Sequence, residues 1–185
     1  MIERMIMAGF GGQGMMMIGK LLTGVAMDEG LHVTFFPSYG AEVRGGTAHC
    51  HVVMSDEPVF SPMVEEADTL IIMNQPSYDK FRPRLRAGGL LLLNTSMTEP
   101  VESLEAASPA TIVPLAATHE ANLLGNVRVA NVLMLGAYAC ARETVSAESI
   151  LAGVEAMLTG RKAHLLEANQ RAFRKGQELA AQAVA

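Results

Sequence analysis

The stretch that decides the fold is Ile2-Glu3-Arg4-Met5-Ile6-Met7-Ala8-Gly9-Phe10-Gly11-Gly12-Gln13-Gly14-Met15, at the start of the chain. Its first part, Ile2–Ala8, is a short and mostly apolar run of the kind found in buried strands. The glycine-rich turn that follows leads into a helical pattern over Met15–Glu29, which stops at Gly30 as helices often do. A strand, a glycine turn and a helix in this order are typical of α/β proteins.

The rest of the chain continues this alternation of strands and helices. The pattern predicts further strands at His32–Phe36, Thr47–Met54, Thr69–Met73, Leu90–Asn94 and Thr111–Leu115. It predicts helices at Pro76–Leu85, Asn126–Ala141, Ser146–Leu158 and Ala163–Ala183, with Gly88-Gly89 as a turn and Thr95–Ala110 as a surface excursion. We therefore expect an α/β fold: a single three-layer α/β/α domain over residues 1–185, Rossmann-like, with a mostly parallel sheet and a helical C-terminal portion.

The composition excludes several classes of protein. The 185 residues carry a net charge of −5, so no basic surface for nucleic acid is expected. The most apolar segment, Val127–Ala141, contains Arg128 and is too short to span a bilayer. Two cysteines do not make a disulfide framework, and no secretion signal opens the chain. We expect a cytoplasmic protein without nucleic-acid or membrane partners.

The chain is also rich in methionine, with 13 residues, three of them consecutive at Met15-Met16-Met17. Consecutive residues on a helix cannot all face one core. We therefore expect at least one of the three to point outward or toward another subunit.

The glycine loop at residues 9–14 satisfies the G-x-G-x-x-G pattern between a strand and a helix, which is the context of dinucleotide-binding sites. The acidic residue that would hold a ribose at the tip of the second strand is missing, because Phe35–Ser38 stands there. A phosphate-loop interpretation fails at Leu21, where a magnesium-binding hydroxyl is needed. The loop is either a tight structural turn or a contact for an anion or a partner chain. The candidate residues are Gly9, Gly11, Gly12, Gln13 and Gly14.

A second glycine-rich loop, charged and lodged between two predicted strands, follows Ser38. It could be a solvated surface loop, or a protein interface to which Tyr39 contributes contact area. Alternatively, Arg44 could clamp a carboxylate or a phosphate in a bidentate way. The candidate residues for a protein interface or for an anionic ligand are Tyr39, Gly40, Glu42, Arg44, Gly45, Gly46 and Thr47.

The third predicted strand carries two histidines, a residue type that often binds metals. His49 and His51 share one face of the strand and could supply half of a metal site, but Cys50 faces the opposite side and no third ligand is identifiable. We therefore predict no metal site and no catalytic residue in this chain. Motifs for a serine nucleophile or a cysteine-rich iron–sulfur cluster are also missing.

Taken together, these motifs resemble one family over nearly the whole chain, the gamma subunits of 2-oxoacid:ferredoxin oxidoreductases. The matching segments are Gly9–Gly14, Pro37–Thr47, Ser61-Pro62, Ala67-Asp68, Asn131 and Asn169–Gly176. The form Arg44-Gly45-Gly46-Thr47 resembles the 2-oxoglutarate type more than the pyruvate type.

The resemblance implies a complex that oxidatively decarboxylates a 2-oxoacid to an acyl-coenzyme A and reduces ferredoxin. Thiamine diphosphate, magnesium and iron–sulfur clusters would belong to companion alpha, beta and delta subunits. The present chain would be an accessory subunit, inactive alone, with a role in structure or in coenzyme A binding. Two alternatives stay open: a stand-alone nucleotide-binding Rossmann-like protein that uses the Gly9–Gly14 loop, and a self-associating scaffold.

Overall fold

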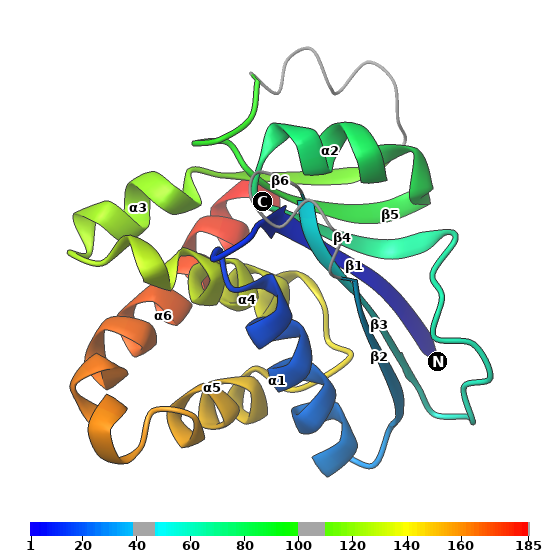
Figure 1. Ribbon diagram of the computed structural model, residues 1–185, viewed down its shortest axis with the longest axis horizontal. Helices are drawn as coiled ribbons and strands as arrows, with labels where there is room; N and C mark the ends of the chain where they lie inside the picture. The colour runs from blue at the N-terminus through cyan, green and yellow to red at the C-terminus, as the bar shows by residue number, and fades with distance from the viewer. Residues whose placement is uncertain (39–46, 100–109, 185) are drawn as a thin grey trace.

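The computed structural model describes residues 1–38, 47–99 and 110–184, which form one α/β domain around a six-stranded sheet (Figure 1). The strands are β1 (Ile2–Phe10), β2 (His32–Ser38), β3 (Thr47–Ser55), β4 (Ala67–Ile72), β5 (Leu85–Asn94) and β6 (Thr111–Leu115). Their order across the sheet is β2-β3-β1-β4-β5-β6. Strand β3 is antiparallel to both of its neighbours, whereas β1, β4, β5 and β6 run parallel. The predicted α/β fold with a mostly parallel sheet is confirmed.

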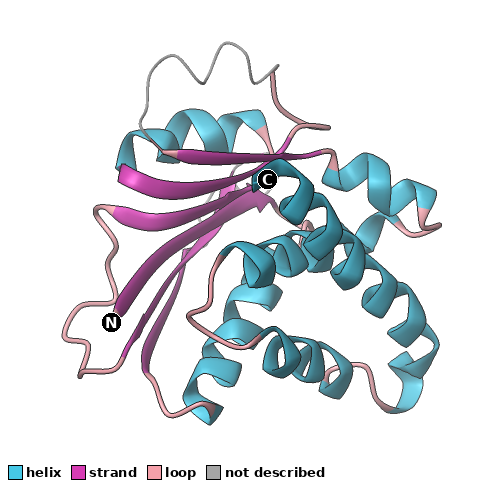
Figure 2. Cartoon of the chain, turned by 180° about the vertical axis from the view of Figure 1, so that it is seen from behind, coloured by secondary structure: helices cyan, strands magenta, loops and turns pink. Residues whose placement is uncertain are grey.

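The helices cover the two faces of the sheet unequally (Figures 1 and 2). They are α1 (Met15–Asp28), α2 (Gln75–Phe81), α3 (Ala117–Leu123), α4 (Ala130–Ala141), α5 (Ala147–Ala156) and α6 (Leu166–Val184), with 3-10 turns η1 (Arg82–Arg84), η4 (Val127–Val129) and η5 (Gly160–Leu165). Helices α1, α4 and α6 pack on one face, with α5 packed against these helices, and α2 packs on the other face. Within the described residues, no helix is both long and apolar enough to cross a membrane.

The two cores follow from the alternation of side chains along the strands. In β1, Met5 and Met7 enter the core beneath α1 and α4, while Ile6 and Ala8 enter the core beneath α2. Strand β3 alternates in the same way, with Cys50 on the side of α1. Each central strand is therefore apolar on both faces, as parallel strands between helical layers must be.

Helices α4 and α6 approach each other so closely that only glycine fits at the crossing. A Cβ atom added to Gly176 would lie 2.8 Å from the carbonyl carbon of Leu133 and 2.9 Å from the backbone nitrogen of Ala137. Gly136 has the reciprocal position, with the carbonyl carbon of Phe173 at 2.8 Å. Helix α4 is consequently buried on nearly all sides, which explains its uniformly apolar sequence.

Three elements differ from the sequence-based expectation. The helix predicted over Pro76–Leu85 ends at Phe81, because Pro83 tightens the chain into η1 and β5 already begins at Leu85. The predicted turn at Gly88-Gly89 is instead an irregularity inside β5, where the register with β4 shifts. Helix α3 was not predicted.

Two predicted helices also begin later than expected. The helical segment predicted from Asn126 starts with η4, and α4 begins only at Ala130. The C-terminal helix predicted from Ala163 starts as η5, and α6 begins at Leu166. Short 3-10 turns at helix ends are common, and sequence patterns rarely separate them from the helix itself.

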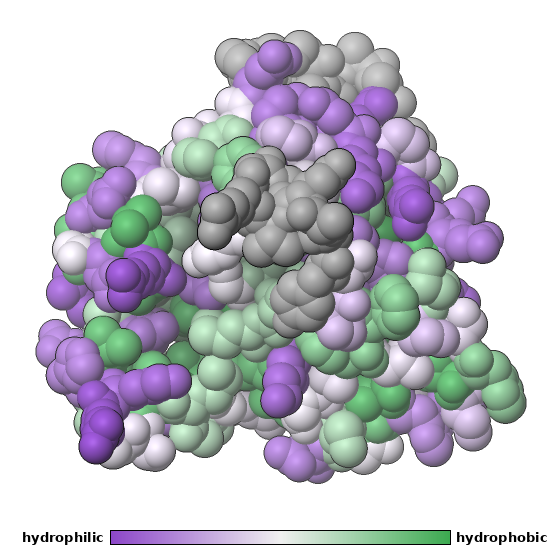
Figure 3. Space-filling view, viewed as in Figure 1, coloured by the Kyte–Doolittle hydropathy of each residue, from purple (hydrophilic) through white to green (hydrophobic). Residues whose placement is uncertain are grey.

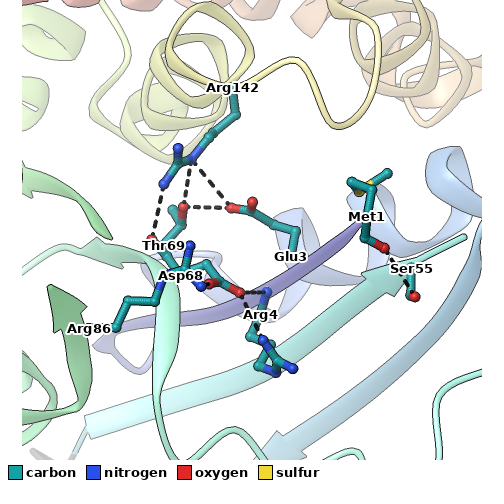
Figure 4. Close-up of polar contacts among 8 residues, drawn as sticks. All are labelled: Met1, Glu3, Arg4, Ser55, Asp68, Thr69, Arg86 and Arg142. Atoms are coloured by element: carbon teal, nitrogen blue, oxygen red, sulfur yellow. Dashed lines mark hydrogen bonds and ion pairs between the residues drawn. The ribbon is translucent and has the colours of Figure 1, made fainter. Parts of the chain in front are cut away.

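A buried polar cluster ties the helical layer to the amino ends of the central strands (Figure 4). Arg142, just after α4, donates from Nε to the Thr69 hydroxyl (3.2 Å) and from Nη2 to the Asp68 carbonyl oxygen (3.1 Å). The Thr69 hydroxyl donates to Glu3 Oε1 at 2.6 Å, and Arg142 Nε lies 3.6 Å from the same oxygen. Desolvation outweighs the Thr69 hydrogen bond and the Arg142 charge, so burial raises the pKa of Glu3 above its usual value.

The Asp68 carboxylate completes this cluster. It accepts the backbone N–H of Arg4 at 2.7 Å and pairs with the Arg86 guanidinium at 2.5 Å. Because Asp68 is buried and both arginines reach solvent, the carboxylate holds β1, β4 and β5 together at one end of the sheet.

Candidate functional site

The glycine loop, residues 9–14, leaves β1 at the carboxyl ends of the central strands (Figure 1). Here β1 and β4 lie side by side, but α1 follows β1 onto one face and α2 follows β4 onto the other. The chain therefore diverges at this point, and a crevice opens between the two loops. In open α/β sheets, ligands bind at such switch points.

Gln13 and Gly9 build the loop itself. The Gln13 side-chain oxygen accepts the backbone N–H of Phe10 at 2.6 Å and the Asn74 amide at 3.3 Å. A Cβ on Gly9 would lie 2.6 Å from this Gln13 oxygen and 2.9 Å from Cβ of Met73. Gly9 is thus required so that Gln13 can fold back beneath its own turn.

Gly14 caps helix α1 with a left-handed backbone (φ 77°), beneath Asn131 of α4. The Asn131 amide donates to the Gly14 carbonyl oxygen at 3.4 Å. Among the described residues, no side chain caps this helix end and no acidic residue lies in its first turn. The N–H groups at the start of α1 therefore keep the positive potential that favours an anion.

Gly11 and Gly12 form the exposed tip of the loop. Gly12 has φ 96°, a conformation that favours glycine, and a Cβ there would meet nothing within 4 Å. The tip is therefore open to contact from outside, unlike Gly9 and Gly14, which are required by packing.

A cavity of about 260 Å³ lies beside the loop. Its lining residues are Gly12, Gln13, Met73, Met97, Thr118, Val127, Arg128, Ala130 and Asn131. Arg128 is the charged residue among them and adds to the positive potential of α1. Ligand pockets for drug-sized molecules measure roughly 300–1,000 Å³, so this cavity suits a small anionic group or one part of a larger ligand.

Two asparagines that the sequence analysis did not single out hold the rim of this cavity. The Asn74 side-chain oxygen caps α2 by accepting the N–H of Ser77 at 2.9 Å. The Asn94 amide donates to the Met73 carbonyl oxygen (3.1 Å) and to the Thr118 hydroxyl (2.8 Å), and its oxygen accepts the Thr118 N–H (3.2 Å). Their signal in the sequence is a polar residue at the carboxyl end of an apolar run.

The charged loop falls largely outside the described residues, including Tyr39, Gly40, Glu42, Arg44, Gly45 and Gly46. Its two flanking residues are described. Ser38 ends β2, and Thr47 begins β3 opposite Phe10, at the edge from which the glycine loop departs. The structure thus brings the attachment points of both candidate loops to the same end of the sheet.

The two histidines of β3 pack against α2. The ring centroids of His49 and Phe81 are 4.7 Å apart, and those of His49 and His51 are 5.6 Å apart. His51 Nδ1 accepts the backbone N–H of Val64 at 3.0 Å. Desolvation lowers the pKa of both histidines, that of His51 to about 4, so both are neutral near pH 7. Within the described residues, no group of three His, Cys, Asp or Glu side chains could hold a metal ion.

The two cysteines do not fit an iron–sulfur cluster, which needs several thiolates close together. Cys50 is buried beneath α1, where its Sγ donates to the Met15 carbonyl oxygen at 3.6 Å. Burial raises the pKa of this thiol to about 12. Cys140 is exposed on the far side of α4, so the pair offers no common site.

The fold and the site together define a Rossmann-like α/β domain with a cavity beside the glycine loop at its switch point. Comparison with known proteins then identifies the family. Residues 4–179 match the model of the pyruvate ferredoxin/flavodoxin oxidoreductase family, and the chain belongs to that family.

Two curated relatives illustrate how the domain occurs. The 2-oxoglutarate synthase subunit KorC of Methanocaldococcus jannaschii is 33% identical over 177 residues, covering 94% of this chain and 91% of that protein. The ketoisovalerate oxidoreductase subunit VorA of Methanothermobacter thermautotrophicus is 35% identical over 178 residues, covering 96% of this chain. The chain spans only 36% of that VorA protein, so the same domain also occurs within a longer polypeptide.

Solved structures agree with this assignment. The gamma subunit of a keto/oxoacid ferredoxin oxidoreductase from Geobacter sulfurreducens superposes with a TM-score of 0.80 at 27% identity, covering 97% of this chain and 99% of that one. The 2-oxoglutarate:ferredoxin oxidoreductase of Magnetococcus marinus, with 2-oxoglutarate, coenzyme A and succinyl-CoA bound, gives 0.87 at 22% identity and matches 98% of this chain to 31% of that one. The resemblance to gamma subunits is confirmed, whereas the alternative of a stand-alone nucleotide-binding protein gains no support.

Proposed function

We propose that this chain is the gamma subunit of a 2-oxoacid:ferredoxin oxidoreductase, formed as one domain over residues 1–185. The carrying observation is the end-to-end match with separate subunits, which covers 91% of KorC from M. jannaschii and 99% of the Geobacter gamma subunit. The match to KorC over nearly its whole length supports 2-oxoglutarate as the substrate of the complex, and the similar identity to VorA supports ketoisovalerate as the alternative. The reaction is the oxidative decarboxylation of the 2-oxoacid to an acyl-coenzyme A, with reduction of ferredoxin.

In this proposal the chain acts in the cytoplasm with alpha, beta and delta subunits. Those companions carry thiamine diphosphate, magnesium and iron–sulfur clusters. The clusters are assigned to them because the thiols of this chain do not fit a cluster. Cys50 is buried with a raised pKa, and Cys140 lies apart from it on the surface. The present chain contributes shape and binding surface rather than a redox centre.

The proposed role of the glycine-loop cavity is to hold an anionic part of coenzyme A. The support is physical: Gly12 of the open loop tip and Arg128 both line a cavity of about 260 Å³, and the loop leads directly into the uncapped start of α1. Coenzyme A carries several phosphates on a long molecule, so a small cationic cavity would grip one end of it. The charged loop from Tyr39 to Thr47, with Arg44 at its centre, would contact coenzyme A or a companion subunit nearby.

The function is tested by reconstitution. The chain is co-expressed with its companion subunits, and 2-oxoacid-dependent reduction of a viologen dye is measured with and without it. The complete complex is expected to turn over, and the isolated chain is expected to be inactive. Activity of the isolated chain, or full activity of the complex without it, would contradict the proposal.

The coenzyme A site is tested with Arg128→Ala in the reconstituted complex. A charge-assisted hydrogen bond is worth about 1.5–3 kcal/mol, so the KM for coenzyme A should rise by about tenfold or more. Arg161→Ala, at an exposed arginine in η5, is the matched control and should leave the KM unchanged. Equal KM values for the two variants would contradict coenzyme A binding in this cavity and would not affect the subunit assignment.

A further inference from the structure

The exposed face of helix α1 is unusual in composition. Its solvent-facing residues are Met17, Lys20, Gly24, Met27 and Asp28, which recur every three to four positions and form one stripe along the helix. Met17 is 37% exposed and Met27 is 60% exposed. Met15 is buried and Met16 is partly buried, so the prediction that one of the three consecutive methionines points outward is confirmed.

The stripe forms one wall of an apolar groove of about 420 Å³ between α1 and α5. The wall from α1 consists of Met17, Lys20, Leu21, Gly24, Val25 and Asp28. The opposite wall consists of Gly153 in α5 and Met157 directly after α5. Met157 is itself 38% exposed. Figure 3 shows this face of the molecule, where hydrophobic residues lie along α1 between hydrophilic ones. Exposed apolar surface of this kind, edged by charges, marks an interaction site.

Gly24 lies at the centre of the stripe. Glycine in an exposed helix interior is less favourable than alanine, and a Cβ on Gly24 would meet nothing within 4 Å. Gly153 differs, because a Cβ there would lie 2.6 Å from a methyl of Val25. The packing of the described chain therefore explains Gly153 but not Gly24. A missing side chain at Gly24 is useful where a second backbone comes close.

We propose that a second copy of this chain docks in the groove, with the two α1 helices crossing antiparallel at Gly24. The argument is the symmetry of charge about this residue. Lys20 precedes Gly24 by four positions and Asp28 follows it by four, so each lies about 6 Å along the helix from the crossing point. A two-fold axis through Gly24 then places Lys20 of each copy opposite Asp28 of the other. The surface is self-complementary, as an isologous dimer interface requires.

The exposed methionines complete this interface. Met17 lies on the same stripe beyond Lys20, Met27 lies on it between Gly24 and Asp28, and Met157 borders the groove from the side of α5. Their flexible side chains adapt to an opposing helix. One helix crossing with these flanks buries less than the roughly 800 Å² per partner of a standard stable interface. We therefore expect a weak, reversible dimer.

Charge reversal tests both the surface and the symmetry. Sedimentation velocity of the full chain, from about 1 to about 300 µM, should show a reversible monomer–dimer equilibrium. Lys20→Glu alone, or Asp28→Lys alone, replaces two attractive pairs by two repulsive ones and should weaken the dimer about tenfold or more. The double variant Lys20→Glu/Asp28→Lys restores both pairs and should restore dimerisation. Gly24→Leu should abolish it, and the added Cβ meets nothing within 4 Å inside the monomer.

Lys162→Glu, at an exposed lysine in η5 away from the groove, is the matched control and should leave the equilibrium unchanged. The proposal is overturned if the wild-type chain stays monomeric over the whole range, or if the double variant dissociates like the single ones. None of these measurements depends on oxidoreductase activity, so they stand apart from the proposed function.

Discussion

The close contact between α4 and α6 makes Gly176→Ala a sharp test of the packing. The new methyl would lie 2.8 Å from the Leu133 carbonyl carbon and 2.9 Å from the Ala137 nitrogen. Carbon atoms pack best at about 3.5–4.0 Å, so the helices must separate by roughly 0.7 Å or more. Overpacking costs about 1–3 kcal/mol, and the upper end applies because the obstacle is backbone rather than a flexible side chain. For a chain of this size, about 3 kcal/mol corresponds to a fall in Tm of roughly 6–12 °C.

The measurement is thermal unfolding followed by circular dichroism and calorimetry. The matched control is Gly24→Ala, the same substitution in another helix, where a Cβ meets nothing within 4 Å. That variant should raise the free energy of unfolding by about 0.5–1 kcal/mol, because alanine is the better helix former. Both are measured at low protein concentration, so that self-association does not contribute. A Gly176→Ala protein that melts within about 2 °C of the wild type would refute the close approach of the two helices.

Three further outcomes are expected. Asp68→Asn removes a buried carboxylate that interacts with two arginines and a backbone N–H. The free energy of unfolding, measured by urea titration, should fall by about 2 kcal/mol, and an unchanged urea midpoint would contradict this. Burial raises the pKa of Glu3, so the folded state binds this proton more tightly than the unfolded state does. The free energy of unfolding should therefore decline as pH rises from about 4.5 through the folded pKa, and urea titrations should show a shallower decline for Glu3→Gln. An equal decline with pH in the two proteins would count against this. A thiol reagent at about pH 8 should modify the exposed Cys140 at once and Cys50 only after unfolding, since burial raises the pKa of Cys50 to about 12; rapid reaction of both thiols in the native protein would disprove this.

Much of the fold was predictable because its signals are local. Short, continuous apolar runs mark β1 and β4, and the alternation of side chains marks β3; both are signals of strands that lie within a few residues of sequence. Helix α3 was missed because seven residues with no side-chain cap give a weak helical signal. The irregularity at Gly88-Gly89 was interpreted as a turn, since glycine also marks bulges inside strands and the partner strand decides between the two.

The candidate site was predictable only in part. The glycine loop is contiguous in sequence and was located from its pattern. Arg128 and Thr118 come from segments more than 100 residues further along the chain, and only the packing of α3 and α4 against the carboxyl ends of the strands brings them to the loop. Asn94 has the same status, because its importance depends on the hydrogen bonds that it makes to Met73 and Thr118.

The bracing of the turn by Gln13 has a consequence for recognition. Its side-chain oxygen accepts hydrogen bonds from the Phe10 N–H and the Asn74 amide, both within the protein itself. The loop should therefore keep the same conformation before and after a ligand binds, and binding does not carry the entropic cost of ordering a flexible segment. Structures with and without a ligand should superpose closely at this turn, and any conformational adjustment should occur in the ligand.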